Sequence, residues 1–262
     1  LMTFANMIYF MKNKILLLSL VMMSSTLFMD AQRQISAQQN TWFMYFGNHR
    51  LSDKWGIHTE YQWRREDLGQ NWQQSLMRVG VDYYIPDGPM LTAGYGWIQS
   101  FPYGEQPISY SFNEHRIWQQ MILKQKAGRF YFNHRYRLEQ RFLERKTLNS
   151  AAEFEHDEFV FRQRARYRFM VNIPLNHPEM KEKTLFLALY DEPFIQFGKG
   201  VGANTLDQNR LYGALGYQVN KSLQIQAGYL NQMVFKGDGV HAERNHNLQL
   251  GITYNMDFRE KQ

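Results

Sequence analysis

Four arginines occupy every second position near the middle of the chain. They are Arg162, Arg164, Arg166 and Arg168, and they alternate with mainly apolar residues: Phe159, Phe161, Ala165, Tyr167, Phe169 and Val171. A repeat of two residues is typical of a β-strand, whereas a helix with this sequence would have no apolar face. Guanidinium groups bind carboxylates and phosphates through paired hydrogen bonds. The segment therefore predicts a strand with one apolar face and one face suited to anionic groups.

Other charged residues fall on the polar side of the same alternation in the remaining predicted strands. With the four arginines above, they form a candidate charge network in the lumen: Glu60, Arg64, Glu114, Arg116, Arg135, Arg137, Glu139, Arg141, Glu192 and Arg210. In a narrow barrel such side chains interlock as arginine–carboxylate pairs that fill the interior. The alternative is that the excess of arginine leaves a positive constriction, which would attract a small anionic solute.

Motifs for catalysis or metal binding are missing from the sequence. There is no Gly-x-Ser-x-Gly turn, no His-Glu-x-x-His pair and no phosphate-binding glycine loop. Gly198–Gly202 is rich in glycine but precedes no helical pattern, so we expect a flexible loop. His115 and His134 lie on adjacent predicted strands and are candidates for a serine–histidine lipid hydrolase, although no serine is visibly paired with either. The other histidines are scattered, and we expect neither a metal nor a cofactor.

The elements that would position these residues are eleven alternating segments between Trp42 and Phe258, each close to ten residues long. Short turns, such as Pro86–Pro89, alternate with longer polar loops, including a charged loop expected from Glu144 to His156. This pattern predicts an all-β fold, an antiparallel transmembrane β-barrel of about 10–12 strands. Because an antiparallel sheet closes without mismatch only with an even number of strands, we prefer twelve, with Gln34–Gln39 as the missing partner and ten as the alternative.

The apolar faces of these strands are compatible with two environments. A soluble exported barrel that binds a small ligand would bury them, whereas a membrane barrel would turn them to lipid. Mean hydropathy is −0.54, and no segment beyond the N-terminal region is apolar for long enough to span a membrane as a helix. A membrane location would therefore require a closed barrel. Five tryptophans are expected to form an interfacial girdle, with a soluble aromatic core as the alternative: Trp42, Trp55, Trp63, Trp97 and Trp118.

The N-terminal region has the layout of a secretory signal peptide. Met11–Lys14 is basic, Ile15–Phe28 is apolar, and Ala31 is a small residue before a polar segment. A membrane anchor is the alternative, and residues 1–10 resemble translation upstream of the true start. We therefore expect upstream residues and a signal peptide in 1–31, an N-terminal segment in 32–40, the barrel in 41–258 and a tail in 259–262.

Export also constrains the expected partners. The chain has no cysteine, which argues against a secreted domain held together by disulfides. After cleavage, 28 basic and 23 acidic residues leave a charge of about +5, but export argues against nucleic acid as the partner. An exported barrel of this kind would have outer-membrane lipid and the barrel assembly machinery as partners, and we expect a small anionic solute at most as a ligand.

Four stretches resemble a known outer-membrane barrel family, the domain-of-unknown-function family 2490 (DUF2490). They are Phe112–Gln120, Arg135–Phe142, Asp191–Phe194, and Asp207–Tyr212 followed by Gly216–Gln218. The resemblance spans roughly Thr41 to Phe258. It implies a β-barrel in the outer membrane of a Gram-negative cell and no biochemical activity, because the family has none assigned. Outer-membrane strands commonly end the chain on an aromatic residue, whereas here Phe258 is followed by four more residues.

Three functions are compatible with these observations. The first is a non-enzymatic envelope protein, either structural or a narrow pore that prefers anions. The second is a lipid-modifying barrel enzyme that uses His115 or His134. The third is a soluble exported barrel that binds a small ligand.

Overall fold

The structure is a computed structural model that describes residues 33–105 and 107–259. The predicted signal peptide and the upstream residues lie outside this part of the chain. The described residues from Ile35 onward form one compact unit. Eleven strands and one turn of 3₁₀ helix, η2, follow one another: β1 (Gln34–Arg50), β2 (Trp55–Glu66), η2 (Asp67–Gly69), β3 (Asn71–Tyr84), β4 (Met90–Ser100), β5 (Phe112–Ala127), β6 (Phe130–Leu148), β7 (Phe154–Pro174), β8 (Thr184–Phe197), β9 (Leu206–Gln218), β10 (Leu223–Phe235) and β11 (His241–Tyr254).

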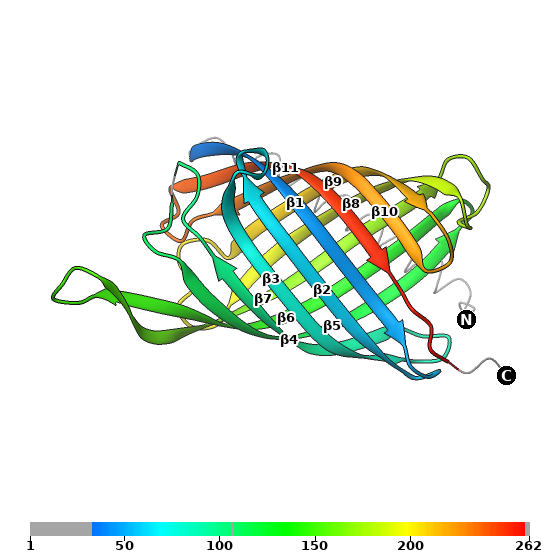
Figure 1. The fold of residues 1–262 in the computed structure, drawn as a ribbon, viewed down its shortest axis with the longest axis horizontal. Helices are drawn as coiled ribbons and strands as arrows, with labels where there is room; N and C mark the ends of the chain where they lie inside the picture. Colours follow the sequence, from blue (N-terminus) through cyan, green and yellow to red (C-terminus); the bar gives the residue numbers. More distant parts are fainter. Residues whose placement is uncertain (1–32, 106, 260–262) are drawn as a thin grey trace, which may run out of the picture. The chain divides into compact units, whose positions relative to one another are not determined.

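The strands close into a barrel in sequence order (Figure 1). Antiparallel pairings join each strand to the next, from β1 and β2 to β10 and β11. With an odd number of strands, β1 and β11 run in the same direction, so the closing pair is parallel, as is the bridge between Arg50 and Asp257. At this seam the Arg50 backbone N–H donates to the Met256 carbonyl at 2.8 Å.

The prediction of an all-β barrel of about 10–12 strands is therefore confirmed. The preference for twelve was wrong, because the parallel seam removes the requirement for an even number. Gln34–Gln39 is not a separate strand, since these residues begin β1.

Side chains alternate between the interior and the outer surface along the strands. On β3, Met77, Val79 and Val81 are about half exposed at 52%, 51% and 53%, while Arg78 and Asp82, which lie on the other parity of the strand, are buried at 4% and 0%. Successive side chains of a strand point to opposite faces, so a period of two in the sequence becomes an apolar outside and a polar inside. The interior of so small a barrel is filled by side chains.

The tryptophans divide between the two faces. Trp55 and Trp97 lie on the outer surface at 51% and 39% exposure, whereas Trp42 and Trp118 are buried inside the barrel at 1% and 0%. The expected girdle position was therefore wrong for these two. Trp118 follows Arg116 by two residues, which places its ring on the inward side of β5 with the charged groups.

An apolar cluster occupies part of the interior. Its buried members are Trp42, Met44, Met170, Phe186, Ala188, Tyr212, Ala214 and Leu230. Phe186 packs directly against Gly216, where an added Cβ would lie 2.1 Å from the phenyl ring. The lumen thus combines this cluster with the charged residues described below, and glycine allows the two neighbouring strands to accommodate a large ring.

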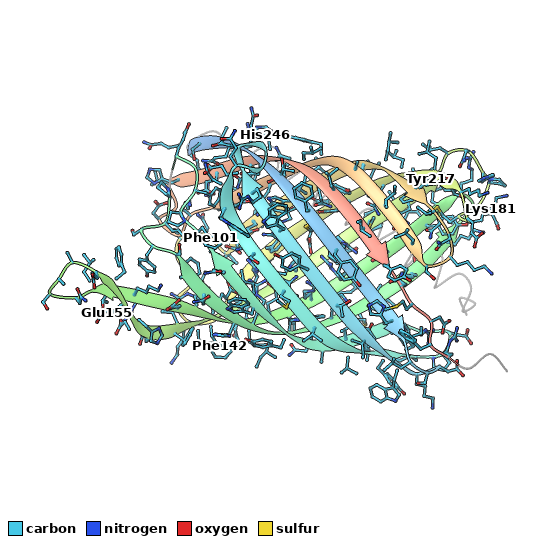
Figure 2. The ribbon with its side chains drawn as sticks, viewed as in Figure 1. Phe101, Phe142, Glu155, Lys181, Tyr217 and His246 are labelled. Atoms are coloured by element: carbon cyan, nitrogen blue, oxygen red, sulfur yellow. The ribbon has the colours of Figure 1, made fainter. Side chains whose placement is uncertain are left out.

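β6 and β7 extend beyond the other strands as a two-stranded projection, which we call the ribbon (residues 144–160). β5 pairs with β6 only as far as Leu143, and β8 pairs with β7 only from Gln163 onward. Figure 1 shows this hairpin projecting past one end of the barrel, and Figure 2 places Glu155 near its tip. The expected loop from Glu144 to His156 is therefore largely strand, and only residues 149–153 form the turn.

Candidate functional site in the barrel interior

Glu139, on β6, is the centre of the charged interior. Its side chain is fully buried and accepts hydrogen bonds from Arg164 at 2.6 Å and from Arg166 at 2.8 Å, both on the neighbouring β7. Arg116 on β5 and Arg78 on β3 reach it at 3.3 and 3.4 Å. Because β3 is not a sheet neighbour of β6, the contact with Arg78 crosses the lumen.

Three further glutamates extend this cluster toward other strands. Glu192 accepts hydrogen bonds from Arg135 at 2.6 Å and from Arg166 at 2.9 Å. Arg166 therefore bridges Glu192 and Glu139. Glu114 likewise pairs with Arg141, at 2.8 Å.

The third glutamate, Glu60 on β2, pairs with Arg78 at 2.6 Å and lies 3.9 Å from Arg137. Arg164 also pairs with Asp207 at the start of β9. We call the connected set the Glu139 network: Glu60, Arg78, Glu114, Arg116, Arg135, Arg137, Glu139, Arg141, Arg164, Arg166, Glu192 and Asp207. Its side chains connect seven strands through the interior of the barrel: β2, β3, β5, β6, β7, β8 and β9.

Ten of the fourteen candidate residues from the sequence lie in this network, and the other four are arginines with different surroundings. Arg168 lies 5.6 Å from the ring centre of Tyr190. Arg162 is only half-buried and donates to the backbone carbonyl of Phe161, so it does not join the buried pairs.

Arg64 and Arg210 are buried, but neither forms an ion pair. Arg64 donates to Gln74 at 2.6 Å and also to Gln62, which are neutral amides. Its guanidinium carbon lies 4.0 Å from the centre of the Trp42 ring, and that of Arg210 lies 5.1 Å from the same ring. The two arginines therefore share one aromatic partner in a part of the lumen lined by amides.

Two members of the network, Arg78 and Asp207, are not among the residues selected from the sequence. Arg78 follows the inward alternation of its strand, so the signal was present in the pattern. Asp207 precedes the expected start of its strand at Asn209, so periodicity alone did not place it inside. The aromatic partners Trp42 and Phe194 were also missed, because alternation does not predict which rings stack on which arginines.

The two histidines considered for lipid hydrolysis are not arranged as catalytic bases. His115 forms a hydrogen bond with the Tyr95 hydroxyl at 2.5 Å, and His134 forms one with the Tyr167 hydroxyl at 2.8 Å. In the described part of the chain, no serine hydroxyl is bonded to either ring. The register also pairs His134 with Leu123 rather than with His115, so the two lie well apart along the strands.

Metal binding has no evident site. Among the residues that the structure describes, no three His, Cys, Asp or Glu side chains come together in a group that would hold a metal ion. The inward charges are mostly paired guanidinium and carboxylate groups, which suit electrostatic cross-linking of strands rather than acid–base chemistry on a substrate.

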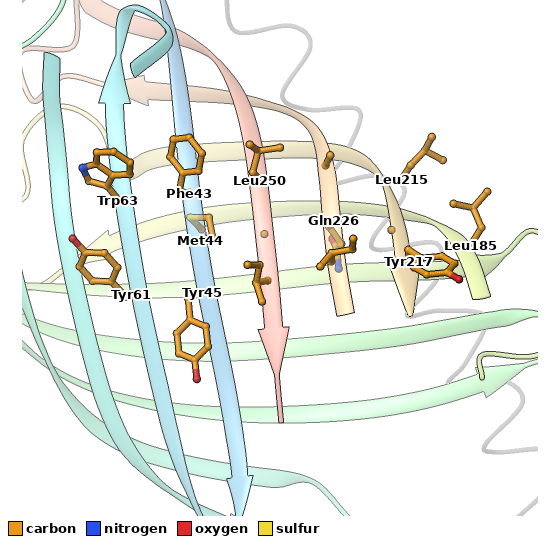
Figure 3. Close-up of a pocket in the computed structure, with 15 residues that line it drawn as sticks. Phe43, Met44, Tyr45, Tyr61, Trp63, Leu185, Leu215, Tyr217, Gln226 and Leu250 are labelled. Carbon is orange, nitrogen blue, oxygen red and sulfur yellow. The ribbon is translucent and has the colours of Figure 1, made fainter. Parts of the chain in front are cut away.

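A hollow of about 520 Å³ lies on the outer surface around the seam between β1 and β11. Figure 3 shows Phe43, Trp63 and Leu250 among the side chains around it, with Met44 and Gln226 deeper. Gly216 and Gly251 contribute no side chains, which leaves the space open. The hollow is suited to apolar contacts, and it offers no arrangement of nucleophile and base.

Within residues 33–105 and 107–259, no helix is long and apolar enough to cross a membrane.

Comparison with known proteins gives one match. The family model described as "Protein of unknown function (DUF2490)" matches residues 39–244. No curated protein and no solved structure matches the chain. The family match covers strands β2 to β10 entirely and therefore includes the whole Glu139 network.

Proposed function

This chain belongs to the DUF2490 family of proteins of unknown function, and we propose that it is a non-enzymatic outer-membrane β-barrel protein whose lumen is closed by the Glu139 network. In this role the barrel anchors the chain in the membrane and presents the ribbon and the neighbouring loops on one side.

The observation that carries the proposal is the apolar outer surface around a charged interior. Large apolar side chains are exposed on every strand from β2 to β11, including Ile117 on β5 at 49%, Leu215 on β9 at 55% and Ile252 on β11 at 48%. Soluble proteins rarely expose apolar surface in so continuous a distribution. In lipid, an apolar surface is not exposed to water and is therefore not unfavourable. A closed barrel also leaves no backbone N–H or C=O group without a hydrogen-bond partner in the membrane.

A closed lumen is favoured over an anion-preferring pore. Glu139 is 1% exposed, Arg78 is 4% exposed, and their contact crosses the interior. A water-filled channel would leave such groups hydrated and accessible. The arginines therefore support a plug formed by side chains rather than the lining of a channel.

Cell fractionation and bilayer recording together test this proposal. We expect the protein to sediment with outer membranes, to require detergent for extraction and to give no conductance in planar bilayers. Recovery as a soluble protein would contradict the membrane location, whereas stable single-channel steps would contradict closure and support the pore.

A matched pair of variants makes the conductance test sharper. Truncating both Arg78 and Glu139 to alanine removes the crossing contact and should produce measurable conductance. The same truncation of Arg145 and Glu158, which pair at 3.1 Å on the exposed ribbon, should leave the barrel silent.

A further inference from the structure

Arginines outnumber carboxylates in the interior of the barrel. In the part of the chain that the structure describes, five carboxylates form ion pairs with a set of ten inward arginines. The arginines are Arg64, Arg78, Arg116, Arg135, Arg137, Arg141, Arg164, Arg166, Arg168 and Arg210, and the carboxylates are Glu60, Glu114, Glu139, Glu192 and Asp207. Arginine stays protonated in proteins, so the imbalance is a real positive charge. Buried charge without a counter-charge is costly.

The other buried carboxylates do not correct this imbalance. Asp82 accepts hydrogen bonds from Thr92 and Asn48. Glu243 pairs with Lys236. Neither carboxylate forms an ion pair with an arginine of the interior.

Within the described residues, three of the ten arginines form no ion pair: Arg64, Arg168 and Arg210. Arg168 lies apart, near the Tyr190 ring, whereas Arg64 and Arg210 lie together at the Trp42 ring. The best side-chain acceptor of Arg210 is the Gln208 amide at 3.5 Å, and its Nε atom is buried without a hydrogen-bond partner. Glu192 is its direct neighbour on β8, but the Glu192 carboxylate is bonded to Arg135 and Arg166 instead. Arg210 is thus a buried cation, 7% exposed, with an unused donor.

Aromatic rings hold both guanidinium groups in position without neutralising them. Arg64 and Arg210 share the Trp42 ring, and Arg210 also lies 4.7 Å from the centre of the Phe194 ring. Cation–π contacts stabilise a guanidinium group but leave its charge and most of its N–H donors available. The side chains that accept hydrogen bonds from these two arginines, Gln62, Gln74 and Gln208, are neutral.

We propose that the barrel binds a small inorganic anion between Arg64 and Arg210, inside the lumen. The anion supplies the counter-charge that the chain itself lacks, and it accepts hydrogen bonds from the buried N–H groups. The inference rests on the closed lumen of the proposed function but not on the membrane location. It differs from a pore, because the anion is held as part of the folded structure.

The test measures urea unfolding of the purified barrel in a neutral detergent, in a buffer whose only other anion is a bulky sulfonate. Sodium chloride and inorganic phosphate are titrated separately at constant ionic strength. We expect the urea midpoint to rise and then saturate with at least one of these two anions, because a ligand that binds only the folded state stabilises it. The anion that saturates at the lower concentration indicates the size of the site.

Variants distinguish a specific site from general screening. Arg64→Gln and Arg210→Gln should each abolish the saturable shift. Arg162→Gln removes the same charge from a half-buried arginine away from the proposed site, and it should retain the shift. A midpoint that responds to neither anion in the unmodified protein, or an undiminished shift in either of the first two variants, would overturn the proposal. If either variant does not fold, crystals of the unmodified barrel are soaked in bromide instead. We expect an anomalous peak between the two arginines, and its absence would overturn the proposal.

This experiment separates the two proposals. A barrel that fractionates with membranes and is silent in bilayers, yet shows no anion dependence, retains the proposed function and loses the anion site. A soluble barrel with saturable anion dependence would retain the anion site and lose the proposed membrane location.

Discussion

Glu139 is the residue on which the interior depends most, because four arginines from three strands donate to or pair with its carboxylate. Replacing it with glutamine preserves the shape but removes the charge. We expect Glu139→Gln to lower the free energy of unfolding by about 3–5 kcal/mol, the usual cost of breaking a buried ion pair. Urea unfolding in detergent micelles measures this change.

The control is Glu158→Gln on the exposed ribbon. Glu158 is about half exposed and pairs with Arg145 at 3.1 Å. Exposed pairs contribute roughly 0–1 kcal/mol. Equal losses for the two substitutions would show that the Glu139 network contributes no more to stability than a surface pair.

Asp238 provides a pH-dependent test at the residue scale, in the loop between β10 and β11. Hydrogen bonds from the backbone and side chain of His241, and from the backbone of Val240, lower the pKa of the Asp238 carboxyl from 3.8 to about 2. A carboxyl with a lowered pKa stabilises the turn above its unfolded pKa, and this contribution is lost as the pH falls from about 4 to 2.

Carboxyl NMR of the labelled protein measures the titration midpoint directly. We expect a midpoint near pH 2 in the intact barrel. Titration of Asp238 at its ordinary value near 3.8 would show that these hydrogen bonds are not formed in solution.

At the scale of elements, the strands could be predicted from alternation, whereas their ends and partners could not. The repeat of two is a property of the backbone, so Arg164 and Arg166 were predicted on the face opposite Tyr167. Alternation does not predict the ribbon, because its charged residues do not alternate with apolar ones. Its two strands nevertheless pair with each other, with one shift of register between Arg145 and Lys146. Partners across the lumen, such as Arg78 and Glu139, depend on barrel closure and leave no local pattern in the sequence.

The ribbon should be dispensable for folding of the barrel. Replacing residues 146–157 with Asn-Gly joins Arg145 to Glu158, which are already paired, through a favoured two-residue hairpin turn. We expect the free energy of unfolding to change by less than about 1 kcal/mol, because exposed hairpin tips tolerate deletion. Urea unfolding measures the change, and failure of the shortened chain to form a barrel would contradict this prediction.

A smaller substitution at the same end of the barrel should cost more. The Tyr103 hydroxyl donates to the buried Glu243 at 3.0 Å and accepts from the buried Asn245 at 3.4 Å. Tyr103→Phe leaves both groups without this partner, for which we expect a loss of roughly 1–3 kcal/mol. The same urea experiment compares the two changes, and a Tyr103→Phe variant as stable as the original would show that the loop contributes nothing here.

At the scale of the whole molecule, the barrel closes through one parallel pair that the sequence did not indicate. Even strand numbers are common in outer-membrane barrels, but odd numbers occur. The apolar exterior and the polar, partly charged interior, by contrast, follow from alternation along the strands. Whether that exterior contacts lipid is a property of the whole barrel, and it is the central claim of the proposed function.

Spin-label accessibility tests this claim most directly, because the chain has no cysteine and a single one can be introduced anywhere. A nitroxide at Val79→Cys, in the middle of β3 at a position 51% exposed, reports on the outer surface, and one at Glu155→Cys near the ribbon tip reports on water. In phospholipid vesicles, we expect the label at position 79 to be relaxed by oxygen but protected from a water-soluble nickel chelate, with the reverse at position 155. Equal access of the nickel chelate to both labels would contradict a membrane-spanning barrel.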